Sequence, residues 1–124
     1  MVQTATQWTF DVERGPDWLF VKVHCPPRIS ADDNLSVAVW EMLETQFVRR
    51  LVLEVDKLPH LSSRLMGQLV KLHKQIETCG GLLRLCGMSD ANQEVLRRSR
   101  LDVLFPQYCS RHEAVLGTRP VKPR

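Results

Sequence analysis

The 124 residues are enough for one domain, and a composition of 44% hydrophobic and 25% charged residues excludes a wholly disordered chain. The net charge of +3 comes from scattered basic residues without a dense basic stripe, so we do not expect nucleic-acid binding. No run of about 18 apolar residues is long enough to span a membrane, and residues 1–7 lack the apolar region of a signal peptide.

The chain carries no motif for metal binding or catalysis. Its cysteines show neither CxxC nor zinc-finger spacing, and they stand at Cys25, Cys79, Cys86 and Cys109. No Ser-His-Asp order, glycine-rich phosphate loop or HExxH occurs. We therefore expect a cytoplasmic protein with reduced thiols, no cofactor and no enzymatic activity.

Two alternating segments open the chain. Residues 8–13 alternate between apolar and polar side chains, and residues 18–24 place Leu19, Val21 and Val23 on one face. A Gly-Pro-Asp turn separates them, which predicts an antiparallel hairpin. Two prolines then end the second strand, because proline cannot donate to a strand ladder.

A first helix is expected after polar residues 32–34, which offer N-cap side chains. Its apolar residues recur at helical spacing, and they are Leu35, Val39, Met42, Leu43 and Phe47. Trp40 lies beside this stripe and is a candidate anchor for a partner. Residues 51–55 form a nearly continuous apolar run, typical of a strand buried on both faces.

A second helix is predicted over residues 62–78, with Ser62 or Ser63 as its N-cap and Gly80 at its end. Its apolar stripe consists of Leu65, Leu69, Leu72 and Ile76. A strand at 82–86 follows, then a helix capped by Ser89 and a short helix at 110–116. Strands that alternate with helices predict an α/β fold with a mixed sheet.

The segment from Leu51 to Lys74 resembles the central motif of STAS domains, the sulphate-transporter and anti-sigma-factor-antagonist family. The order and spacing of three later segments agree with this family: Gly80 to Cys86, Ser89 to Leu96 and Leu101 to Pro106. The resemblance covers most of residues 8–116. It implies one small α/β domain at 1–116, with a mixed sheet of four to five strands, the N-terminal strand antiparallel, flanked by four to five helices. Residues 117–124 are expected to be a flexible basic tail.

The resemblance implies binding to an anti-sigma factor or a related kinase-like ATPase, with phosphorylation of a serine where the second helix begins. That serine corresponds to Ser63. Ser62 stands where the family has Asp, Arg64 where it has a second Ser or Thr, and Leu65 where it has Gly. The expected partner-binding residues are Glu54, Asp56, His60, Ser62, Ser63, Arg64 and Gly67.

Two alternatives remain open at the level of sequence. The chain is either a switch of this kind or a degenerate STAS module, which serves as a non-phosphorylated scaffold or as a sensor of a nucleotide or lipid near residues 56–67. The two serines also suit simple helix capping. Nothing in the sequence indicates an oligomeric state.

Overall fold

The protein consists of alternating strands and helices. The computed structural model describes residues 2–3, 8–24, 35–58 and 60–117. The strands are β1 (Val2–Gln3), β2 (Thr9–Arg14), β3 (Leu19–His24), β4 (Arg50–Glu54), β5 (Leu82–Cys86) and β6 (Gln107–Tyr108). The helices are α1 (Leu35–Gln46), α2 (Ser63–Thr78), α3 (Asp90–Arg98) and α4 (Arg111–Leu116).

The strands form one mixed sheet in the order β1-β2-β3-β4-β5-β6. β2 pairs antiparallel with β3, and β3, β4, β5 and β6 pair in parallel. The predicted α/β class, the N-terminal hairpin and the parallel centre are therefore confirmed. The sequence did not indicate β1 and β6, two-residue pairings that extend the sheet at its edges.

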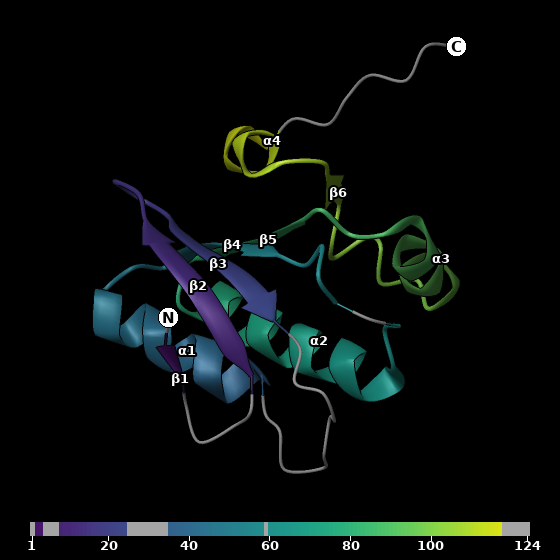
Figure 1. Cartoon of the computed structure of the whole chain (residues 1–124), viewed down its shortest axis with the longest axis horizontal. Helices are drawn as coiled ribbons and strands as arrows, with labels where there is room; N and C mark the ends of the chain where they lie inside the picture. The colour runs from purple at the N-terminus through teal and green to yellow at the C-terminus, as the bar shows by residue number, and fades with distance from the viewer. Residues whose placement is uncertain (1, 4–7, 25–34, 59, 118–124) are drawn as a thin grey trace.

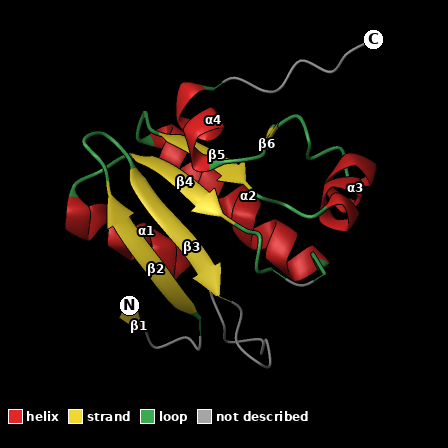
Figure 2. Cartoon of the chain, turned by 45° about the horizontal axis from the view of Figure 1, so that its top comes forward, coloured by secondary structure: helices red, strands yellow, loops and turns green. Residues whose placement is uncertain are grey.

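Helices cover the two faces of the sheet unequally (Figures 1 and 2). α1 and α2 pack on one face, where the main core takes alternate strand residues such as Leu19, Val21, Leu51 and Leu53. The other face carries α4 and a smaller apolar cluster, which consists of Trp18, Val52, Cys86, Tyr108 and Ala114. Val52 faces the smaller cluster while Leu51 and Leu53 face the main core, so β4 is buried on both faces, as its apolar run predicts.

The end of α1 differs from the prediction. Phe47 does not continue the apolar stripe, because α1 ends at Gln46 and the Phe47 ring is 92% exposed. The N–H of Phe47 donates to Glu44 O at 3.3 Å and that of Val48 to Leu43 O at 3.2 Å, the two bonds of a Schellman turn. This turn requires the left-handed backbone of Phe47 (φ 56°) and sends Val48 into the core instead.

Some sequence predictions lie outside the described residues: the two prolines at 26–27, the N-cap candidates at 32–34, Cys25 and the tail at 118–124. Gly117, placed in the tail by prediction, is the left-handed C-cap of α4. Cys79, Cys86 and Cys109 are free thiols. Among the described residues no cluster of three His, Cys, Asp or Glu side chains suits a metal, and none of the described helices is long and apolar enough to cross a membrane.

Candidate functional site

The candidate site lies where the chain leaves the carboxyl end of β4 and enters α2. The N–H of Val55 donates to Cys86 O at 3.0 Å, which extends the contact between β4 and β5 by one residue. The N–H of Leu58 then donates to Val55 O at 3.2 Å in a tight turn, and the Leu58 side chain is buried. Ligand sites of open α/β sheets are found at this end of the strands.

The two adjacent serines have different roles at the start of α2. Ser62 is the N-cap: its backbone is extended, and its Oγ accepts a hydrogen bond from the N–H of Leu65 at 3.2 Å. Ser63 is the first helical residue and is exposed, and its hydroxyl has no hydrogen-bond partner in the part of the chain that the structure describes. Of the two N-cap candidates, the cap is therefore Ser62, and the hydroxyl of Ser63 remains accessible.

Leu61, the residue before the cap, is anchored to α3. Its side chain is 1% exposed, and its backbone N–H donates to Oδ1 of Asn92 at 2.8 Å. Asn92 is itself 2% exposed, in the first turn of α3. Sequence reasoning missed Asn92, although a polar residue four positions before the buried Leu96 lies on the same helix face and was a signal for such a buried contact.

Most of the predicted partner-binding residues share this end of the molecule. The exposed ones are Asp56, His60, Ser62, Ser63, Arg64 and Gly67. Gly67 is four residues after Ser63 and thus on the same face of α2, and a Cβ there would meet no atom of the described residues within 4 Å. Within the described part of the chain, no side chain therefore covers the helix surface beside the Ser63 hydroxyl. The guanidinium of Arg64 forms no ion pair with the described residues.

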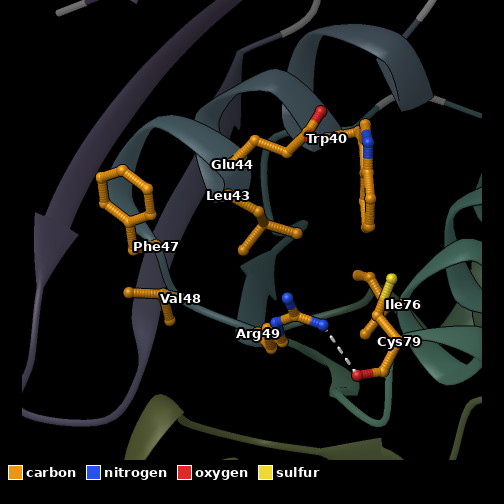
Figure 3. Close-up of a pocket in the computed structure, with 8 residues that line it drawn as sticks. All are labelled: Trp40, Leu43, Glu44, Phe47, Val48, Arg49, Ile76 and Cys79. Atoms are coloured by element: carbon orange, nitrogen blue, oxygen red, sulfur yellow. Dashed lines mark hydrogen bonds between the residues drawn. The ribbon is translucent and has the colours of Figure 1, made fainter.

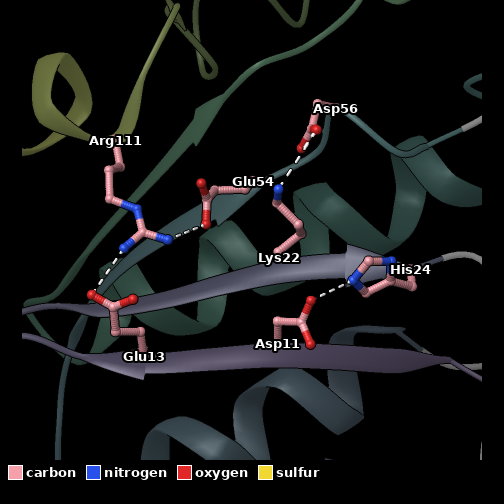
Figure 4. A network of polar contacts seen from close by, with 7 residues as sticks. All are labelled: Asp11, Glu13, Lys22, His24, Glu54, Asp56 and Arg111. Carbon is pink, nitrogen blue, oxygen red and sulfur yellow. Dashed lines mark hydrogen bonds and ion pairs between the residues drawn. The ribbon is translucent and has the colours of Figure 1, made fainter. Parts of the chain in front are cut away.

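Glu54, the last residue of β4, points to the sheet face that carries α4, where Arg111 binds it (Figure 4). Arg111 of α4 donates to its carboxylate at 2.7 Å and pairs with Glu13 of β2 at 3.1 Å. The hydrogen bond to Glu54 raises the pKa of Arg111. Asp56, two residues after the end of β4, forms an ion pair of 3.8 Å with Lys22. Sequence reasoning did not single out Arg111, because it is 57 residues away from Glu54 along the chain.

A pocket of about 370 Å³ lies at the opposite end of α2 (Figure 3). It opens between the last turns of α1 and α2, and its lining residues are Trp40, Leu43, Glu44, Phe47, Val48, Arg49, Ile76 and Cys79. Trp40 is half-buried and turns its ring toward this pocket. The pocket includes none of the residues 56–67, where the small-molecule alternative places its ligand.

Comparisons with known proteins agree on one family. Residues 9–114 match the family model described as STAS domain. No curated protein matches the sequence. Among solved structures, TM1081 from Thermotoga maritima is similar with a TM-score of 0.75 at 17% identity, over 94% of this chain and 93% of that chain.

Two further structures share the fold. An anti-sigma factor antagonist from Mycobacterium paratuberculosis is 18% identical, with a TM-score of 0.72 over 96% of this chain and 100% of that chain. The phosphorylated form of the Bacillus cell fate determinant SpoIIAA is 15% identical, with a TM-score of 0.63 over 90% of this chain and 100% of that chain. Because the family model spans nearly all of the described fold from β2 to α4, the chain belongs to the STAS domain family.

Proposed function

We propose that this chain is a cytoplasmic regulatory domain that binds an anti-sigma factor or a related kinase-like ATPase, with Ser63 as its phosphoacceptor. It acts by binding and not as an enzyme, and it needs no cofactor. The observation that carries the proposal is the exposed Ser63 hydroxyl, which has no hydrogen-bond partner among the described residues, since Ser62 caps the helix. Proteins of the same fold include an anti-sigma factor antagonist and a phosphorylated cell fate determinant.

The departures from the family motif leave the acceptor accessible. Leu65 replaces a glycine, but its side chain is 2% exposed, so its bulk lies in the core and not beside Ser63. Ser62 replaces an aspartate and still caps the helix through its side-chain oxygen. Neither replacement places an obstacle on the surface that a kinase approaches.

A phosphate on Ser63 is electrostatically compatible with the folded domain. The first turn of α2 has unpaired N–H groups and a partial positive charge, and a phosphate adds about −1.5 to −2 charges there. The exposed Arg64 gives a second positive group next in sequence. The modification therefore changes the partner surface, where a charge must be desolvated on docking, more than it changes the fold.

The test uses a kinase-type anti-sigma factor, ATP and Mg²⁺, with intact-mass measurement. Wild type and Ser62→Ala should gain one phosphate, and Ser63→Ala should gain none. Binding should survive in Ser63→Ala and weaken in Ser63→Asp. The proposal is wrong if Ser63→Ala is still phosphorylated, or if Ser63→Ala and Ser63→Asp both bind like wild type.

Arg64 favours a second candidate, a scaffold that binds without phosphorylation. An arginine stands where the family has a second Ser or Thr, and its charge opposes part of the charge that a phosphate would add. This candidate predicts stable co-purification with a partner that is not a kinase. A sensor of nucleotides or lipids would instead be revealed by a thermal shift with these ligands.

A further inference from the structure

We propose that Asn92 of α3 is a positioning residue that fixes the start of α2, and with it the direction in which Ser63 is displayed. The inference rests on the proposed function for its consequence, and on the bond between Asn92 Oδ1 and the Leu61 N–H for its structural part. Helix α3 would thus hold the phosphoacceptor in position, although none of the predicted partner-binding residues lies on α3.

The anchoring bond is short, buried and connects distant segments. Donor and acceptor are 2.8 Å apart and 31 residues apart in sequence, and the side chains of Leu61 and Asn92 are 1% and 2% exposed. A buried backbone N–H that loses its acceptor is costly, since water does not replace the bond. The chain just before the cap is therefore held in one place.

Asn92 is in turn held by the cap of its own helix. Its backbone N–H donates to Oγ of Ser89 at 3.2 Å, the N-cap of α3. The N-caps of α3 and α2 are thus connected in series: Ser89 holds Asn92, Asn92 holds Leu61, and the next residue, Ser62, caps α2. Ser63 follows directly, so the direction of its hydroxyl depends on where Leu61 is held.

A neighbouring side chain offers a matched control. Gln93 also lies in the first turn of α3, is half-buried, and donates from Nε2 to Met88 O at 2.9 Å. This bond stays within the α3 region and does not touch the start of α2. Gln93→Leu therefore removes a side-chain-to-backbone bond of similar length from the same helix turn, without releasing Leu61.

The first measurement is amide hydrogen exchange of the full chain by NMR, with thermal unfolding to verify folding. Asn92→Val should speed exchange at Leu61 on the order of tenfold, which corresponds to about 1.4 kcal/mol, and should speed it at the core residues Leu69 and Leu72 by no more than the loss of global stability explains. Gln93→Leu should leave Leu61 as in wild type. Asn92→Asp keeps a side-chain oxygen acceptor near the helix N-terminus but lacks the amide donor of Asn92, so the exchange of Leu61 should be slower than in Asn92→Val without fully reaching the wild-type rate.

The second measurement is steady-state phosphorylation of Ser63 by a kinase-type anti-sigma factor with ATP. Asn92→Val should lower kcat roughly tenfold, since a misplacement of about 1 Å can cost a hundredfold, and should change KM by less than about twofold. Gln93→Leu should change neither constant, and the kcat of Asn92→Asp should lie above that of Asn92→Val. A role confined to overall stability would not separate kcat from KM in this way.

Three results would overturn the proposal: unchanged exchange of Leu61 in Asn92→Val, equal effects of Asn92→Val and Gln93→Leu, or an unchanged kcat in a variant whose Leu61 exchanges faster. If wild type is not phosphorylated at all, the phosphoacceptor role of Ser63 fails. The exchange of Leu61 then still decides whether Asn92 fixes the start of α2.

Discussion

Arg111 and Glu54 are joined by a hydrogen bond of 2.7 Å that ties α4 to the central strand β4. The same guanidinium pairs with Glu13 on β2 and lies over the ring of Phe20, 4.6 Å from its centroid. At the other end of α4, Arg84 of β5 donates to the carbonyls of Ala114 and Val115. Arg111 and Arg84 therefore hold the two ends of this short helix against the sheet, over the smaller apolar cluster.

Arg111→Gln should destabilise the protein by about 1 kcal/mol, because it removes charge-assisted bonds to two carboxylates at a partly exposed site. Urea unfolding measures this. Arg98→Gln is the control, since Arg98 pairs with Glu94 inside α3 at the surface and should cost no more than about 0.5 kcal/mol. Equal losses in the two variants would show that Arg111 is an ordinary surface charge.

The thiol of Cys86 should report on whether α4 is in place. Burial under α4 raises the pKa of Cys86 to about 12, with the charge of Glu54 contributing further. Only the thiolate reacts, so at pH 8 Cys86 should label far more slowly than the exposed Cys109. Ellman's reagent followed by peptide mass analysis measures both rates.

Arg111→Gln should accelerate the labelling of Cys86, because α4 uncovers this thiol more often, and should leave that of Cys109 unchanged. The loss of the Arg111 charge by itself acts in the opposite direction, since that charge lowers the pKa of Cys86, so a faster rate reports exposure of the thiol. Labelling of Cys86 as fast as that of Cys109 in wild type would contradict the burial on which this prediction depends.

Local patterns in the sequence predicted most of the fold, because helix periodicity, helix caps and strand alternation are all visible within a few residues. The stripe of α2 and the caps Ser62 and Ser89 follow from spacings of three and four residues. The two-residue pairing of β6 with β5 has no such pattern, and the helix-stop at Phe47 carries no glycine to reveal it.

The candidate site shows the same division. Ser62, Ser63 and Gly67 are close in sequence, and the structure places them together on one end of α2. The partners of Glu54 and Leu61 are Arg111 and Asn92, which are 57 and 31 residues away. Such contacts form only when the sheet and its crossover helices bring distant segments together. The hydrophobic periodicity of one segment gives no information about them.

The pair of Asp11 and His24 predicts a response to acid. His24 bonds to Asp11 across β2 and β3 at 2.7 Å, and this bond lowers the pKa of Asp11 below its usual 3.8. A carboxyl whose pKa is lower in the folded state adds stability above the unfolded pKa, and this stability is lost as the pH falls through the folded pKa. The loss should therefore begin below about pH 4 and be complete only below the pKa of the folded state.

Carbon-detected NMR titration of the Asp11 carboxyl measures this directly. His24→Gln should move the titration of Asp11 up toward 3.8, whereas Lys22→Gln should change it little, because Lys22 is the weakest cause of the shift. An unchanged titration in His24→Gln would show that the two side chains do not pair in solution.

The side chains of the two serines at the start of α2 should contribute differently to the stability of the protein. Ser62→Ala removes the side-chain acceptor of the Leu65 N–H and should cost about 1 kcal/mol. Ser63→Ala removes a hydroxyl without a partner among the described residues and should stay within about 0.5 kcal/mol of wild type. Urea unfolding of both variants, each with an unchanged m-value, tests this; equal losses would mean that both hydroxyls share the cap.

Phe47→Gly should stabilise the domain, although it deletes an aromatic side chain. Phe47 adopts φ 56° in the turn after α1, a conformation that costs a residue with a Cβ about 1–2 kcal/mol and costs glycine little. Its ring is 92% exposed and contributes little burial. After the larger unfolded-state entropy of glycine is subtracted, the gain in the free energy of unfolding should be about 0.5–1 kcal/mol in a urea titration.

Phe47→Ala is the control. It keeps the Cβ and the strain, so it should show no gain in the same titration. If Phe47→Gly is no more stable than Phe47→Ala, the left-handed turn is not strained in solution. If both variants are less stable than wild type, the Phe47 ring packs against the pocket between α1 and α2 more closely than its exposure indicates.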